Sequence, residues 1–279
     1  MLKKIDSFSK SIIIVFAGTS LVSFLNLLFQ LLIAHRLTAA DFASFNSLLS
    51  VFMLVSSPLA TIQIAVAKYT AEYNAGGQTS KISFLISDLS KKTLILAAAT
   101  FLIFLVGSKA LVSLLKIPSL SCGYILAGLV ASSWLLPVLT GGIQGLELFG
   151  WLAAGSIGSA ASQFAIAAVL ILSGYGLTGA LFALLASSLI NIGVYYFPLK
   201  KHIIEPVVAK GLKYKELLIF LVPVAVSNFC FIALVSFDMV LVKYFFSQAD
   251  SGIYSLSQMV GKIFLFFPGA ISLVMWVVK

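Results

Sequence analysis

The chain has 279 residues, of which 61% are hydrophobic and only 10% are charged, and its mean hydropathy is +1.11. This composition lies far outside the range of soluble domains, so it indicates an integral membrane protein. The net charge of +9 would suit a nucleic-acid-binding protein, but the lysines stand at the ends of apolar segments. We therefore expect contacts to anionic membrane lipids and no nucleic acid.

Eight apolar segments are long enough to cross about 30 Å of hydrocarbon as helices. Each is continuous over about twenty residues, whereas strands of a membrane barrel alternate over about ten. We predict an all-α, polytopic membrane protein with eight transmembrane helices. They cover residues 11–34, 43–67, 93–115, 120–140, 151–173, 176–198, 217–245 and 253–277.

Most lysines fall before the first predicted helix or in loops that follow even-numbered helices. Because cytoplasmic loops collect Lys and Arg, this distribution places both the N-terminus and the C-terminus in the cytoplasm. The first long lysine-rich loop, residues 68–92, contains "ISFLISDLSKK". Its residues Ile82, Leu85, Ile86 and Leu89 share one helical face, which predicts a short helix lying in the membrane interface.

Polar side chains recur at helical spacing in four of the predicted membrane helices. Because polar groups that face lipid are costly, these stripes face other helices or a water-filled cavity, and both interpretations are open. Asn26 and Gln30 are our candidates for a cavity lining. The stripes are Thr19, Ser23, Asn26 and Gln30; Ser47, Ser50, Ser57 and Thr61; Ser156, Ser159 and Gln163; and Ser187, Ser188 and Asn191.

Two charged side chains lie deep in predicted helices, Asp238 in the seventh and Lys262 in the eighth. Both are ~13–15 Å from the turn that joins these helices, at 1.5 Å per residue, so they can pair across the hairpin. Ionisable groups at such depth are functional candidates because an unpaired charge there is costly. Three roles are open: a structural ion pair, a proton or sodium site at Asp238, and a contact from Lys262 to an anionic substrate.

No pattern in the sequence predicts catalysis. Cys122 and Cys230 have no metal or redox spacing, and the predicted topology places His35 and His202 at opposite sides of the membrane. No carboxylate pair or phosphate-binding loop accompanies them. We expect no enzyme activity, no metal and no cofactor.

A short motif occurs twice at an offset of 209 residues, as "LTAADFASF" and "FSQADSGIY". Each copy forms the turn after an odd-numbered helix, and internal repeats of this kind are typical of secondary transporters. We predict that Asp41 and Asp250 serve the turns and helix caps rather than a substrate. The predicted organisation is a six-helix bundle at 1–199, a cytoplasmic linker at 200–216 and two helices of an incomplete second bundle at 217–279.

Four segments together resemble the polysaccharide flippases of the multidrug/oligosaccharidyl-lipid/polysaccharide exporter superfamily. They are "HRLTAADFASFNSLLSVF", "GGIQGLELFGWLAAGSIGSAASQ", "GYGLTGALFALLASSLINI" and "FDMVLVKYFFSQADSGIYSLSQMVGKIFLFFPGAIS". The last is the most specific, since it combines Asp238, the triplet Gly252-Ile253-Tyr254, Lys262 and the pair Pro268-Gly269. The likeness extends over nearly the whole chain.

This resemblance implies two six-helix bundles around a central cavity, and alternating access for a polyprenyl-diphosphate-linked oligosaccharide. The expected location is the bacterial plasma (inner) membrane, and the expected partners are that substrate, membrane lipids, and a glycan polymerase or glycosyltransferases of surface polysaccharide synthesis. Such flippases have twelve to fourteen helices, so eight predict a fragment or truncated product. The alternatives are a multidrug or peptidoglycan-precursor exporter and a non-transporting membrane scaffold.

Overall fold

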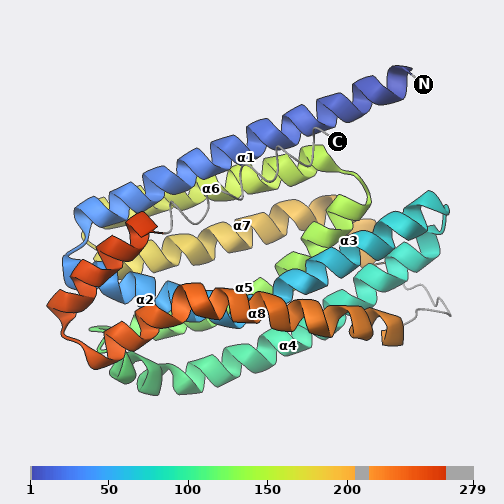
Figure 1. Ribbon diagram of the computed structural model, residues 1–279. Coiled ribbons are helices and arrows are strands. Elements are labelled where there is room, and N and C mark those ends of the chain that lie inside the picture. Colours follow the sequence, from blue (N-terminus) through green and yellow to red (C-terminus); the bar gives the residue numbers. More distant parts are fainter. Residues whose placement is uncertain (1, 205–213, 262–279) are drawn as a thin grey trace.

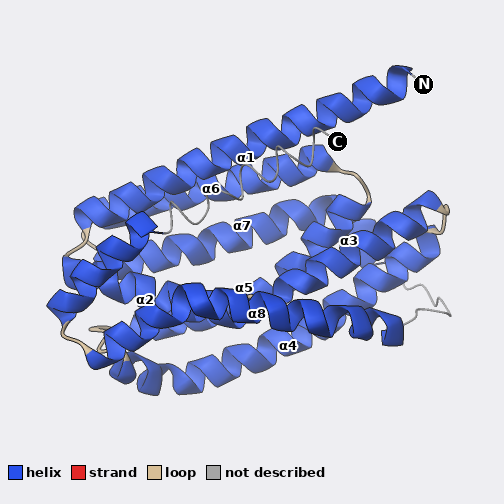
Figure 2. Ribbon diagram, in the orientation of Figure 1, coloured by secondary structure: helices blue, strands red, loops and turns tan. Residues whose placement is uncertain are grey.

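The computed structural model describes residues 2–204 and 214–261, and this part of the chain is helical without strands (Figure 2). Seven of its helices are long and apolar enough to cross a membrane, which confirms an all-α, polytopic membrane protein. The predicted eighth span lies largely outside the described residues. The helices are α1 (Leu2–Arg36), α2 (Ala39–Ser56), α3 (Leu59–Ala75), α4 (Thr79–Leu114), α5 (Leu120–Gly145), α6 (Phe149–Leu172), α7 (Gly176–Ile204) and α8 (Tyr214–Phe245).

The helices form a bundle in which α5 packs against α3, α4 and α7, while α6 packs between α1 and α7 (Figure 1). α8 packs against α2 and α3. A further helix at residues 248–261, which we call the hinge helix, follows α8. We call the end where α1 meets α2 the hinge end, since the hinge helix also lies there, and the opposite end, where α3 meets α4, the far end.

The predicted single helix at 43–67 is wrong, because the structure divides it into α2 and α3 at Ser57 and Pro58. Proline has no N–H, and its ring clashes with the carbonyl four residues earlier, so an α-helix breaks there. After the break, the amide of Thr61 donates to the carbonyl of Pro58 at 3.2 Å rather than to that of Ser57. The break therefore leaves the Ser57 carbonyl outside the helical ladder.

The predicted interface helix at 68–92 is also wrong. α3 continues to Ala75, and α4 runs from Thr79 to Leu114 as one helix, so only residues 76–78 join them. The expected apolar face exists, but Ile82 and Ile86 are buried against other helices rather than in lipid. An apolar helix face that packs against another helix has the same sequence periodicity as one that faces lipid. The sequence pattern therefore could not distinguish the two environments.

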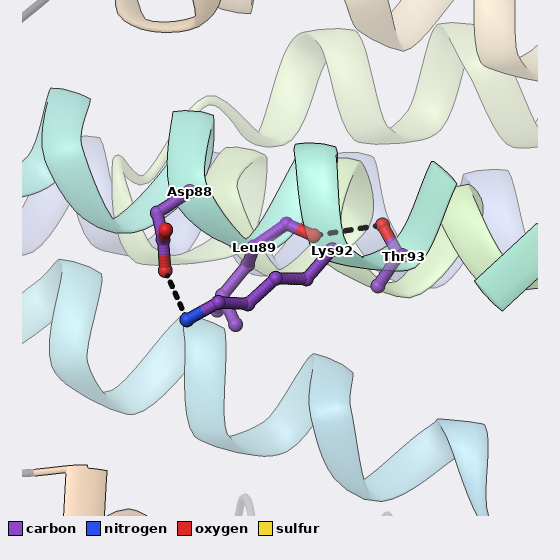
Figure 3. A network of polar contacts seen from close by, with 4 residues as sticks. All are labelled: Asp88, Leu89, Lys92 and Thr93. Carbon is purple, nitrogen blue, oxygen red and sulfur yellow. Dashed lines mark hydrogen bonds and ion pairs between the residues drawn. The ribbon is translucent and has the colours of Figure 1, made fainter. Parts of the chain in front are cut away.

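Two polar contacts in the first half of α4 join residues of the same helix (Figure 3). The ammonium of Lys92 lies 2.7 Å from the carboxylate of Asp88, one turn earlier. The hydroxyl of Thr93 donates to the carbonyl of Leu89 at 2.9 Å. Because the Lys92 side chain is 54% exposed, this ion pair contributes little to stability.

Two apolar cores stabilise the bundle, one toward each end. Phe42, Phe45 and Leu48 of α2 lie in the core at the hinge end. Leu85 of α4 and Tyr195 of α7 lie in the second core, toward the far end. The two cores hold the first seven helices together, and they give the hinge end a fixed surface against which α8 and the hinge helix pack.

Candidate functional site

The two copies of the repeated motif have the same local structure. Thr38 precedes α2, and its hydroxyl accepts from the amide of Asp41 at 3.1 Å and donates to the Asp41 carboxylate at 2.9 Å. Ser247 precedes the hinge helix and makes the same two bonds with Asp250, at 3.2 and 2.7 Å. The prediction that both aspartates serve helix caps is confirmed.

The two motifs also pack against each other. Asn46 on α2 donates from its side-chain amide to the hydroxyl of Ser255 on the hinge helix at 2.7 Å. Gly252 of the hinge helix lies so close to Ala39 that an added Cβ would stand 2.8 Å from the Ala39 methyl. Only glycine permits this approach, and the hinge end is therefore closed by direct contact between the repeats.

Asp238 lies on α8 and accepts hydrogen bonds at both carboxylate oxygens. Tyr254 donates to one oxygen at 2.6 Å, and the side-chain amide of Gln258 donates to the other at 2.9 Å. Both donors come from one face of the hinge helix, which they hold against α8. The predicted partner, Lys262, lies outside the described residues, and the role of Asp238 in ion coupling remains a prediction.

The other two predicted site residues lie apart from Asp238. Asn26 is exposed and Gln30 is half-buried on α1, which packs mainly against α6. Within the described part of the chain, neither side chain makes a hydrogen bond, so the structure does not join them to the Asp238 cluster. Their exposure at membrane depth is compatible with the predicted cavity lining.

The polar stripes of α6 and α7 bond to neighbouring helices. The hydroxyl of Ser156 on α6 lies 3.0 Å from that of Tyr195 on α7, and Ser159 donates to the carbonyl of Ser187 at 3.2 Å. Ser188 lies 2.7 Å from Ser132 of α5. For these stripes the interpretation as hydrogen bonds between helices is correct.

Sequence reasoning missed the position of Lys243. This lysine stands two residues before the end of α8 and is 1% exposed at the hinge end. Its ammonium is buried and has no hydrogen-bond partner among the described residues. The charged groups that interact with this ammonium are the carboxylate of Asp41 and the ammonium of Lys116. Its place near the end of α8 was the only sequence signal, and such positions are normally exposed.

A pocket lies between α3 and α8, beside the break that precedes α3. It has a volume of about 330 Å³ and is lined by Ile64, Pro223, Val224, Ser227 and Asn228. The side-chain amide of Asn228 also donates to the released carbonyl of Ser57 at 3.2 Å. Sequence reasoning missed this pocket too, although Pro58 was available as the signal of an interrupted helix.

Comparison with solved structures defines the class of fold. An inward-facing multidrug resistance MATE family transporter of the MOP superfamily matches with a TM-score of 0.69 and 13% identity, over 84% of this chain and 56% of its own. A MOP superfamily transporter from Pyrococcus furiosus matches with a TM-score of 0.63 and 15% identity, over 81% and 52%. A MATE protein in complex with Br-NRF gives 0.67 and 16%, over 81% and 54%.

The chain is thus a multi-pass membrane protein with the fold of MOP superfamily transporters, the superfamily that the sequence resemblance predicted. It spans about half the length of these structures. No family profile matches the chain, and no curated protein is detectably similar in sequence.

Proposed function

We propose that the chain belongs to a membrane transporter that flips a polyprenyl-diphosphate-linked oligosaccharide across the bacterial plasma membrane. The main support is an asymmetry in the region where α8 packs against α2 and α3, which we call the junction. The repeats close the hinge end through Asn46 and Ser255, whereas the pocket between α3 and α8 lies near the middle of α8, away from this contact. With the hinge end outside, as the lysines predict, we expect a substrate to reach this junction from the cytoplasm.

The candidate residues suit a lipid-linked saccharide. Its head group needs hydroxyl and amide partners, while its lipid tail can remain in the bilayer, and the charged diphosphate needs cations. Asn26 and Gln30 would line the route of the head group, and Lys262 would contact the diphosphate. Asp238 would couple movement of the hinge helix to a proton or sodium ion. Glycosyltransferases would supply the substrate, and a glycan polymerase would use it.

A multidrug exporter is the second candidate, and the likeness of the fold to MATE transporters favours it. A cationic drug would require carboxylates that face a cavity. In the first bundle, Asp41 bonds with Thr38 at a helix cap and Asp88 pairs with Lys92. The partners of Asp41 and Asp88 make these two carboxylates poor ligands for a cation, which supports the saccharide substrate.

Flipping can be measured in proteoliposomes that contain the full chain and a fluorescent polyprenyl-diphosphate-linked oligosaccharide. Added dithionite bleaches only the outer leaflet, so transport raises the bleached fraction above that of protein-free vesicles. The same lipid without its saccharide and an ethidium-efflux assay serve as controls. Flipping of the saccharide lipid alone supports the proposal. Efflux of ethidium alone indicates the drug exporter, and no movement of any compound indicates a scaffold.

A further inference from the structure

We propose that the pocket beside the break between α2 and α3 binds uncharged hydroxyl groups of a saccharide. Its lining consists of Ile64, Pro223, Val224, Ser227 and Asn228. The chemistry of the site follows from the pocket itself, and only the attachment of the saccharide to a lipid rests on the proposed function.

The break supplies a polar backbone group at membrane depth. The Ser57 carbonyl has lost its helical donor, since the amide of Thr61 turns to Pro58. Irregular backbone in a membrane is tolerated only where protein buries it or where it borders a cavity. In many transporters, interrupted helices of this kind form the substrate site. Here Asn228 bonds the released carbonyl and at the same time lines the pocket.

Two polar groups in the pocket remain available to a ligand. Asn228 uses its amide nitrogen for Ser57, and its carbonyl oxygen accepts no bond from the described residues. The exposed hydroxyl of Ser227 has no hydrogen-bond partner within the same part of the chain. Some other hydroxyls on the described helices, such as those of Ser44 and Thr93, bond back to a carbonyl one turn earlier. The Ser227 hydroxyl makes no such bond within the described residues, so it is free to bond a ligand.

The two free groups match a hydroxyl. A ligand O–H can donate to the side-chain oxygen of Asn228 while its oxygen accepts from Ser227. Ile64, Pro223 and Val224 offer apolar surface to the C–H faces of a sugar ring, and no lining residue is charged. A diphosphate or an ammonium would find no counter-ion here, because charged groups need a partner when they leave water.

The size and depth of the pocket fit a part of the head group. Its volume of about 330 Å³ lies at the lower end of the ~300–1,000 Å³ of small-molecule sites, so it holds one portion of a larger oligosaccharide. Asn228 precedes the end of α8 at Phe245 by 17 positions, or ~25 Å at 1.5 Å per residue. A head group that enters from the far end reaches the pocket while the hinge end is closed.

The test uses the full chain in lipid nanodiscs, with Cys230→Ser to remove an exposed thiol and Ile64→Cys as reporter. Ile64 is 47% exposed and lines the pocket, so its replacement leaves Ser227 and Asn228 intact. The rate of alkylation by N-ethylmaleimide is followed by mass spectrometry. The probe is octyl glucoside below its micelle-forming concentration, and octylphosphocholine has the same chain with a zwitterionic head. A cysteine at the exposed turn residue Gln78 is the matched control.

Octyl glucoside is expected to slow alkylation at position 64 at least threefold, with no effect at position 78 and none from octylphosphocholine. Ser227→Ala together with Asn228→Ala is expected to abolish this protection. Ser227→Ala alone breaks no described hydrogen bond, so it preserves the fold and is expected to weaken the protection. Equal slowing by both amphiphiles, or none by the glucoside, overturns the saccharide site. If octyl glucoside protects position 64 but the lipid-linked substrate is not flipped, the saccharide site stands and the proposed transport is rejected. Flipping without protection would reject the site alone.

Discussion

Asn46 on α2 and Ser255 on the hinge helix form a hydrogen bond of 2.7 Å and are 209 positions apart, the offset that relates the two hinge motifs. Contact between equivalent positions arises where a two-fold axis passes between two repeats. Equivalent caps at Thr38 and Ser247 support the same relation. We infer that the pseudo-two-fold axis of the halves passes close to Asn46 and Ser255.

Asn46→Ala is expected to lower the free energy of unfolding by about 1–3 kcal/mol, because it leaves the buried hydroxyl of Ser255 without a partner. Ser255→Ala should have a cost of similar size, and the double variant should cost less than the sum. Unfolding in detergent micelles measures the cycle. Ser257→Ala is the control, because Ser257 bonds only within its own helix, to Ile253. Strictly additive effects would show that the bond does not couple the repeats.

Asp238→Asn is expected to remove the dependence of flipping on a proton gradient, if Asp238 is the coupling group. An amide side chain has one acceptor oxygen and cannot gain or lose a proton at neutral pH. Flipping in vesicles with and without an imposed gradient measures this effect. Asp250→Asn is the matched control, since Asp250 lies in an exposed cap. If the Asp238→Asn variant keeps the full gradient dependence, Asp238 has no coupling role. Its carboxylate then serves only to bond Tyr254 and Gln258.

Lys243→Met is expected to raise the free energy of unfolding by about 1–3 kcal/mol, because a buried ammonium without a hydrogen-bond partner is costly. Methionine fills nearly the same space without a charge. Lys109→Met, at an exposed position on α4, should have little effect by comparison. Destabilisation by the change at Lys243 would mean that the ammonium pairs with an anion in the membrane.

Asn26→Leu combined with Gln30→Leu is expected to slow flipping about tenfold, which corresponds to ~1.4 kcal/mol of lost hydrogen bonding to the head group. Stability should change little, since neither side chain bonds to another described residue. Leu27→Ala and Leu31→Ala are the controls, because both leucines are exposed on the same helix, at 45% and 50%. An unchanged rate in the leucine variants of Asn26 and Gln30 would remove this pair from the cavity.

The errors made from sequence had identifiable physical causes. Pro58 already marked a break within the predicted helix at 43–67, but a continuous apolar run obscured it. The face of Ile82 and Ile86 was recognised, although its neighbour was taken to be lipid rather than protein. The partners of Asp238 were missed because a residue of opposite charge was expected. In the described structure its hydrogen-bond donors are the neutral side chains of Tyr254 and Gln258.

By itself, the sequence determined the membrane location, the helical class and the caps at both hinges. These properties depend on apolar length and on contacts three or four residues apart, such as Thr38 with Asp41, so they can be read from neighbouring letters. The tertiary structure decided that the two hinges pack together, that Lys243 is buried and that Asn228 reaches Ser57. Those contacts join segments far apart in the chain, and their formation depends on how whole helices pack rather than on local preference.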